Sequence, residues 1–148
     1  MNIRKAVQAD LPAVVKMLAN DPLGATRERL DHFEKYVQAF EIIKNDRHQE
    51  LMVVEDQDKE IVGTFHLTFI QYLAHQGRYV AQIESVRVRE DQRGKGVGEK
   101  MFQWAFQHAK EKGAQLVQLT SDKRRPDAKR FYERLGFVAS HEGFKRIL

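Results

Sequence analysis

The sequence contains no cysteine, and its 148 residues include only 3 prolines and 1 tryptophan. The lack of cysteine excludes a disulfide framework, a cysteine nucleophile and thiolate metal sites. No apolar run approaches the roughly 18 residues that a membrane-spanning helix needs. The first residues, MNIRKAVQAD, begin directly with a strand-like pattern and contain no apolar signal core. We therefore expect a cytoplasmic protein that does not associate with membranes.

The remaining composition is typical of one folded domain. Hydrophobic residues make up 42% and charged residues 31% of the chain, a balance that indicates a globular rather than a disordered protein. A domain of this length buries roughly 68–70% of the surface of its unfolded chain, so it needs no metal or disulfide to fold. We expect a single domain over residues 1–148.

The charges are distributed unevenly along the chain. Residues 1–86 carry 10 Lys and Arg against 13 Asp and Glu, whereas residues 87–148 carry 15 against 8. The net charge thus changes from −3 in the first part to +7 in the second. This asymmetry indicates either an anion-binding C-terminal part, for nucleic acid or a phosphorylated small molecule, or a solvated basic surface.

The N-terminal part predicts one strand and two helices. Residues 2–7 have a strand pattern, and Asp10 can cap a helix that has Pro12 in its first turn and ends near residues 20–22. A second helix is expected over residues 26–45. Its apolar residues recur at spacings of three and four and form one stripe, namely Leu30, Phe33, Val37, Phe40 and Ile43.

The middle of the chain predicts an antiparallel meander. Strand patterns cover residues 51–55, 61–72 and 78–89, and they are joined by polar turns at residues 56–60 and 74–77. In the longest of these strands, alternation places four apolar residues on one face: Ile61, Phe65, Leu67 and Phe69.

The C-terminal part predicts alternating helices and strands. We expect a helix at 97–112, a strand at 116–120, a helix at 127–135, and a last strand or hairpin from residues 137–139 and 144–148. A strand, a helix and a strand in succession imply a right-handed crossover and a parallel pair within the otherwise antiparallel sheet.

The segment with the clearest chemistry is Arg-Gly-Lys-Gly-Val-Gly at residues 93–98, between a strand and a helix. Three glycines at alternate positions leave backbone amides bare at the positive end of a helix, which makes an anion site. Lys95 is followed by Gly96, so the segment is not a Walker loop, and its glycine spacing is not that of a dinucleotide loop. The alternative interpretation is a glycine-rich tight turn.

This segment resembles the R/Q-x-x-G-x-G/A loop of the GNAT acetyltransferase superfamily. The flanking sequence is similar too, because residues 83–88 (IESVRV) resemble the family's fourth strand and residues 131–137 (FYERLGF) its FYE(K/R)LGF segment. The motif matches cover about residues 80–138, whereas residues 1–79 agree only in the order of elements. The resemblance implies an α/β fold with six to seven strands in a mostly antiparallel sheet, a splayed central parallel pair and about four helices.

The resemblance also implies acetyl-CoA as co-substrate and no metal. In the family, the loop amides hold the pyrophosphate, and the pantetheine arm runs beside the fourth strand. The residues that match the family's coenzyme contacts are Val86, Arg87, Val88, Arg93, Gly94, Lys95, Gly96, Val97, Gly98, Ala128 and Tyr132. The sequence departs from the family at Arg125, where an Asn is frequent, so Arg125 either contacts a phosphate or faces solvent.

Acetyl transfer to an amine requires a base, because an alkylamine of pKa about 10.4 is almost fully protonated near pH 7. Glu84 is the candidate base, since strand alternation puts it on the same face as Val86 and Val88 and relatives carry a catalytic Glu there. Tyr132 is the candidate acid for the leaving thiol. The alternatives are a structural Glu paired with an Arg and a Tyr that only packs.

Other residues are candidates for roles outside the transfer step. His66 and Tyr72 are candidates for lining an acceptor cleft, which should otherwise be set by the helices within residues 10–45 and the loop at 72–78. The basic run around residues 123–130 resembles a nucleic-acid patch, but no aromatic-rich RNA motif accompanies it. A coenzyme phosphate contact or a solvated face is favoured there, and nucleic acid is not the expected partner.

The sequence therefore predicts an acetyl-CoA-dependent N-acetyltransferase. It would acetylate a primary amine of a small molecule or a peptide by direct transfer in a ternary complex, because there is no cysteine to form an acyl-enzyme. The acidic N-terminal part is compatible with a cationic amine. The alternative is a non-catalytic acyl-CoA-binding or interaction module with the same fold. Relatives often form homodimers, and the sequence leaves the oligomeric state open.

Overall fold

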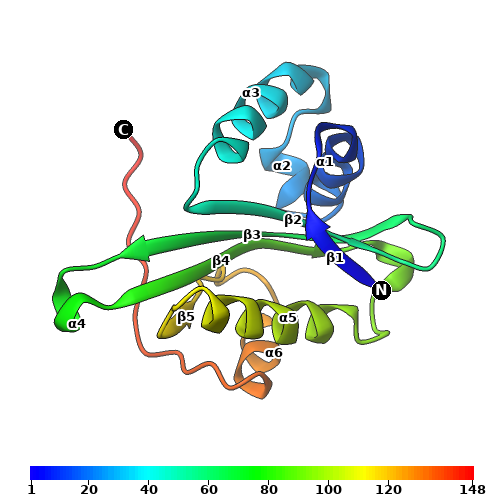
Figure 1. The fold of residues 1–148 in the computed structure, drawn as a ribbon. Coiled ribbons are helices and arrows are strands. Elements are labelled where there is room, and N and C mark those ends of the chain that lie inside the picture. Colours follow the sequence, from blue (N-terminus) through cyan, green and yellow to red (C-terminus); the bar gives the residue numbers. More distant parts are fainter.

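A computed structural model describes residues 1–148 and has a central five-stranded sheet in the order β1-β2-β3-β4-β5 (Figure 1). The first four strands form an antiparallel meander, and β4 and β5 are parallel, as the sequence predicts. The strands are β1 (Asn2–Lys5), β2 (Gln49–Glu55), β3 (Ile61–Gln71), β4 (Tyr79–Val88) and β5 (Leu116–Gln118).

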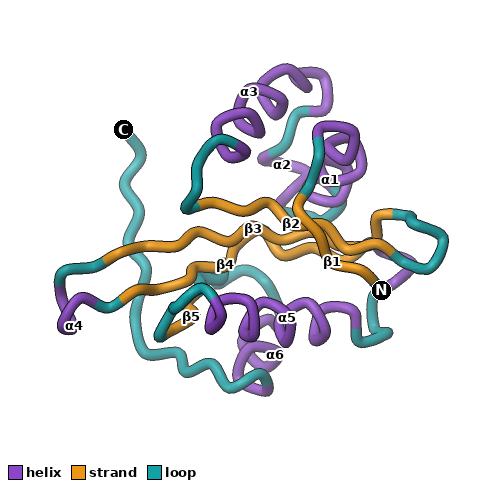
Figure 2. Tube along the Cα trace, viewed as in Figure 1, coloured by secondary structure: helices purple, strands orange, loops and turns teal.

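Helices cover both faces of the sheet (Figures 1 and 2). One face carries α1 (Leu11–Ala19), α2 (Gly24–Arg27) and α3 (Phe33–Lys44), and the other carries α5 (Val97–Glu111) and α6 (Ala128–Arg134). The remaining helix, α4, is a single turn over residues 74–77 that connects β3 to β4. None of these helices is long and apolar enough to cross a membrane.

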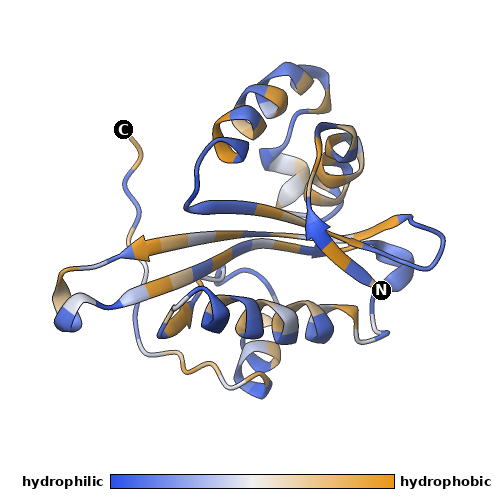
Figure 3. Ribbon diagram, in the orientation of Figure 1, coloured by the Kyte–Doolittle hydropathy of each residue, from blue (hydrophilic) through white to orange (hydrophobic).

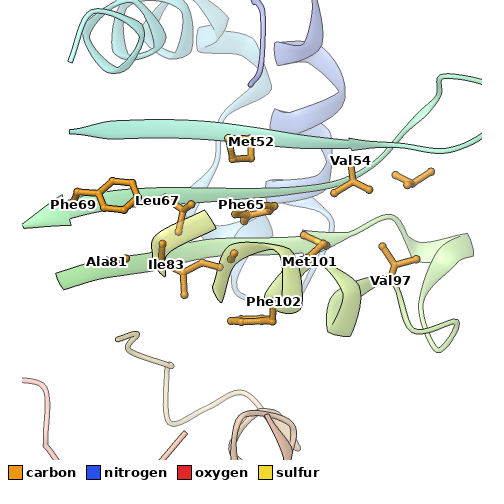
Figure 4. Close-up of a cluster of buried hydrophobic side chains, with 13 residues drawn as sticks. Met52, Val54, Phe65, Leu67, Phe69, Ala81, Ile83, Val97, Met101 and Phe102 are labelled. Carbon is orange, nitrogen blue, oxygen red and sulfur yellow. The ribbon is translucent and has the colours of Figure 1, made fainter. Parts of the chain in front are cut away.

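The main core lies between α5 and the sheet (Figure 4). Alternation along β3 directs Phe65, Leu67 and Phe69 toward α5, where Met101 and Phe102 are fully buried. Full burial of each large apolar side chain stabilises the fold by roughly 1.5–3 kcal/mol. The predicted apolar face of β3 is therefore confirmed for these three residues but not for Ile61, because a register shift against β2 puts Val62 in the core instead. This face fixes α5 against the strands that carry the candidate site.

The predicted single helix over residues 26–45 is wrong. The chain forms α2, then an extended residue at Glu28 (φ −95°, ψ 148°), a 3-10 turn over residues 30–32, and α3. The Tyr36 hydroxyl favours this break, since it accepts a hydrogen bond from the Arg29 amide (3.0 Å) and donates one to Glu28. Leu30 is consequently exposed, and Phe40 is the one fully buried residue of the predicted stripe.

The predicted C-terminal strand or hairpin is also absent. Phe137 packs against Phe102 at a ring distance of 5.9 Å, but residues 138–148 form neither helix nor strand (Figure 2). Val138, Phe144 and Ile147 are exposed. Figure 3 shows apolar stretches, in orange, along this C-terminal tail. The sheet thus has five strands and the chain six α-helices, rather than the expected six to seven and about four.

Candidate active site

The site begins at a β-bulge in β4. His66 pairs with Glu84 and Thr64 with Arg87, so the two β4 residues between them oppose a single residue of β3. Ser85, one of the two, has a left-handed φ of 55°. A bulge of this kind reverses the alternation of side chains beyond it.

The bulge changes which candidate residues share a face. Val86 and Val88 pack against the core on the α5 side, whereas Glu84 is exposed on the opposite face beside its cross-strand partner His66. The expectation that Glu84 lies on the same face as the two valines is therefore wrong. Arg87 takes the face of Glu84 instead, since it pairs with Thr64.

An opening between two strands lies next to this bulge. The parallel pairing of β4 with β5 ends at Gln82 and Gln118, although β4 continues to Val88. The predicted splay of the parallel pair is thus present. Beyond the last pair, the Val86 carbonyl accepts a hydrogen bond from Arg87 Nη1 (2.9 Å) and the Val88 carbonyl one from Arg93 Nε (3.1 Å). These carbonyls accept hydrogen bonds from side chains and not from a neighbouring strand, so a ligand can take the place of the side chains.

The glycine-rich loop forms the entrance to α5. Gly94 and Gly96 have left-handed φ values of 74° and 80°, and an added Cβ at either position would meet no atom within 4 Å. Lys100 is the first residue whose amide bonds back, to the Gly96 carbonyl. The amides of residues 97–99 therefore lack intrahelical partners, and together with the helix dipole they suit an anion.

Tyr132 lies on α6, where its ring packs at 5.8 Å from Phe102 and 6.0 Å from Phe137. Burial raises the pKa of the Tyr132 phenol, and the nearby charges of Arg125 and Arg87 partly oppose this rise. The phenol thus stays protonated at neutral pH and is a proton donor rather than an acceptor.

Two arginines converge on one carboxylate. Arg87 Nε lies 3.0 Å and Arg125 Nη1 3.2 Å from the same oxygen of Asp21, Oδ2. A second ion pair, Arg27 with Asp122 at 2.7 Å, joins the same two segments of the chain. Arg125 at the family's Asn position is therefore held in an ionic cluster. Sequence reasoning missed Asp21, because Asn-Asp-Pro indicated only the end of a helix.

His66 and Glu84 complete the site. The Nε2 atom of His66 is buried and has no hydrogen-bond partner, and Glu84 Oε1 accepts a hydrogen bond from Gln82 Nε2 (3.0 Å). Burial lowers the pKa of His66, and the charge of Glu84 opposes this shift without reversing it. The imidazole is therefore neutral at neutral pH.

The structure assembles most of the candidate residues but not all of them. Glu84, Arg87 and Tyr132 gather around the bulge, and the loop at 93–98 lies at the far end of the opening. Tyr72 is exposed at the opposite end of β4 from Arg87, so it does not reach this site. Two hollows, of about 420 and 130 Å³, lie elsewhere: the larger borders residues 1–3 and α5, and the smaller borders α3 and β2.

Known proteins resemble this chain in sequence and in fold. Residues 15–137 match the model of the acetyltransferase (GNAT) family. Aminoalkylphosphonate N-acetyltransferase from Salmonella typhimurium is 34% identical over 89 residues, which are 60% of this chain and 57% of that protein. The match to this curated relative thus spans little more than half of its length.

Solved structures resemble the chain over its full length. A transcriptional regulator from Bacillus halodurans C-125 is 49% identical, with a TM-score of 0.94 and 99% of both chains covered. A putative acetyltransferase from Agrobacterium tumefaciens is 24% identical, with a TM-score of 0.83 and 100% of both chains covered, and this likeness shows the fold alone.

Proposed function

Since this chain belongs to the acetyltransferase (GNAT) family, whose model matches residues 15–137, we propose that it transfers the acetyl group of acetyl-CoA to a primary amine. The observation that carries the proposal is the free edge of β4 beyond Gln82, continuous with a loop of unbonded amides. The curated relative is named for acetylating an amine, which supports an amine acceptor. We further propose that residues 1–148 act as one transferase domain.

The residues present suit the coenzyme. The amides of residues 97–99 would hold its pyrophosphate, with Arg93 and Lys95 adding positive charge. The left-handed φ and the open space at Gly94 and Gly96 leave room for an anion to approach the backbone. The carbonyls of the β4 edge would accept hydrogen bonds from its amide arm. When bound, the coenzyme supplies the acetyl group as a reactive thioester.

Two side chains of the site would move the protons. Glu84 is exposed and accepts a proton from the incoming ammonium, so that the amine nitrogen has a free electron pair. Tyr132 donates its phenolic proton to the sulfur as the carbon–sulfur bond breaks and the carbon–nitrogen bond forms. Transfer is direct, with both substrates bound. The acylated nitrogen loses its second proton to solvent as the amide forms, and the proton held by Glu84 restores the phenol through solvent.

A second candidate function is a non-catalytic acyl-CoA-binding or interaction module. The Bacillus relative, 49% identical, is called a transcriptional regulator, and this name favours a role other than catalysis. The two functions differ in one result: the module binds acetyl-CoA without acetylating any amine. The joint presence of Glu84 and Tyr132 at the bulge favours the transferase.

The proposal is tested by calorimetric titration with acetyl-CoA, followed by a thiol-release assay with a panel of amines. We expect micromolar binding, weaker binding of dephospho-coenzyme A, and turnover with at least one amine. Binding without turnover on any amine would favour the module. No binding at millimolar acetyl-CoA would contradict both functions.

A further inference from the structure

The ionic cluster on the α1–α2 side of the bulge has more positive than negative charge. Asp21 Oδ1 accepts a hydrogen bond from the Gly24 amide, so its Oδ2 alone faces the guanidinium groups of both Arg87 and Arg125. One carboxylate thus balances two cations. The charge that remains is held in place, because the side chain of Arg87 is only 16% exposed.

Several donors of the two arginines have no partner in the protein. The Nε atom of Arg87 is buried and lies close to Asp21, but the two are not in hydrogen-bond geometry. Of the other two nitrogens of this guanidinium, Nη1 donates to the Val86 carbonyl and Nη2 donates to no protein group. Arg125 donates only through Nη1. A guanidinium has five N–H groups, and a buried charge is costly unless it is paired and hydrogen-bonded. An oxyanion supplies the acceptors that this pair lacks.

The neighbouring residues increase the positive charge. Arg27 and Arg124 both pair with Asp122, at 2.7 and 2.8 Å. Together with Arg87 and Arg125, four arginines face two aspartates, so two positive charges remain uncompensated. A dianionic group balances this excess better than a carboxylate does.

The cluster lies within reach of the reacting groups. Arg87 follows Glu84 by three residues on the same face, and a strand rises about 3.3 Å per residue, so their α-carbons are within about 10 Å of each other. The charges of both Arg87 and Arg125 act on the Tyr132 phenol. An anion held by the arginines therefore places an amine a few bonds away beside Glu84.

We propose that Arg87 and Arg125 bind an anionic group of the acceptor, which is a small primary amine carrying a phosphonate or phosphate. This inference rests on the proposed transferase function, and it names the acceptor class and the residues that select it. The bidentate fork of arginine suits a tetrahedral oxyanion. On binding, the anion would replace Asp21 as the partner of the two arginines.

The first test compares four acceptors at saturating acetyl-CoA. They are 2-aminoethylphosphonate, O-phosphoethanolamine, β-alanine and the neutral ethanolamine. We expect kcat/KM for the better of the two dianions to exceed that for ethanolamine by at least 100-fold, with β-alanine between them. The two dianions then distinguish a phosphonate from a phosphate ester as the natural group.

The second test uses variants. Arg125→Gln and Arg87→Lys should each lower the ratio of kcat/KM for the preferred dianion to kcat/KM for ethanolamine roughly 10–100-fold. Arg29→Gln is the matched control, because Arg29 pairs with Asp31 at 2.9 Å on the exposed surface and touches no residue of the cluster. If Arg87→Lys fails to fold, the more exposed Arg125 decides the test.

Binding separates this inference from the function on which it rests. Calorimetry measures 2-aminoethylphosphonate binding to the protein saturated with coenzyme A, with and without Arg125→Gln. Arginine-dependent binding without acetylation of any amine would support the anion site and contradict the transferase. Equal turnover of dianionic and neutral amines, unchanged in the variants, would overturn the anion site and leave the transferase intact. Failure of both binding and turnover would overturn both.

Discussion

His66 lies directly opposite Glu84 across the β3–β4 ladder, immediately before the bulge at Ser85. The two side chains share a face of the sheet. His66 is half-buried, and its Nε2 atom is buried without a hydrogen-bond partner. Burial lowers the pKa of this histidine, with the charge of Glu84 opposing the shift, so the ring is uncharged at neutral pH. Glu84 therefore has a neutral and not a cationic histidine as its cross-strand neighbour.

Replacement of Glu84 by Gln should lower kcat roughly 10²–10⁴-fold, because glutamine has the same shape but cannot accept the amine proton. The pH–rate profile should also flatten on its acidic side. Steady-state thiol release between pH 5.5 and 9 measures both effects. Glu41→Gln, on the exposed surface of α3, is the control and should behave like the unaltered protein. Unchanged turnover in Glu84→Gln would remove this residue from the mechanism.

Removal of the Tyr132 hydroxyl should slow the reaction without weakening coenzyme binding. Burial keeps the pKa of the phenol above its ordinary value of about 10, so it is a donor throughout the neutral range. We expect Tyr132→Phe to lower kcat roughly 10–100-fold, because thiolate departs without a proton. The Kd for acetyl-CoA, measured by calorimetry, should change less than about twofold, since the ring still packs against Phe102.

Tyr72→Phe is the matched control for this experiment, because Tyr72 is exposed near the tip of the β3–β4 hairpin. This substitution should leave both kcat and the Kd for acetyl-CoA unchanged. If Tyr132→Phe weakens acetyl-CoA binding and leaves kcat intact, Tyr132 is a binding residue and not the acid.

A negative side chain in the glycine loop should abolish coenzyme binding. Gly96→Glu places a carboxylate at the N-cap of α5, where it competes with a phosphate for the unbonded amides. Gly113→Glu is a matched control: Gly113 also has a left-handed φ (91°) and open space, but it follows the opposite end of α5. We expect calorimetric affinity for acetyl-CoA to fall at least 100-fold in the first variant only. Equal losses in both variants would point to backbone strain instead.

Glu50 should make the stability of the fold depend on pH. Its side chain is only 2% exposed, and it lies 2.6 Å from His108 Nε2 and 3.3 Å from Lys112 Nζ. Burial acts to raise the pKa of Glu50, but the hydrogen bond and charge of His108 and the charge of Lys112 outweigh it, so the pKa is lowered. The carboxylate therefore stabilises the folded state fully above the pKa of the unfolded chain, about 4.3.

This stabilisation is lost as the pH falls through the lower pKa of the folded protein. Urea unfolding should show Glu50→Gln less stable than the unaltered protein by about 1–3 kcal/mol at pH 7. The difference should stay constant down to about pH 5 and shrink below about pH 4. A difference that is independent of pH would show that Glu50 acts through packing and hydrogen bonding alone.

The sequence by itself determined most of the local elements and the glycine-rich loop. Alternating apolar residues in β3 and the apolar stripe of α5 specify which faces meet, because periods of 2 and 3.6 leave one buried face for each element. The glycines at positions 94 and 96 specify the conformation of the loop before α5, because they are suited to left-handed φ and to open space in front of the backbone. The short motifs of the sequence also indicated the family.

Only the tertiary structure decided the faces and charges of the site. A bulge at Ser85 reverses the alternation of side chains, and nothing in the sequence of a strand marks such an insertion. Glu84 and Val86 were therefore expected on the same face of the sheet, but they lie on opposite faces. The pairing of Arg87 and Arg125 with Asp21 joins residues separated by up to 104 positions. Such long-range contacts depend on how helices pack on the sheet, which local periodicity does not encode.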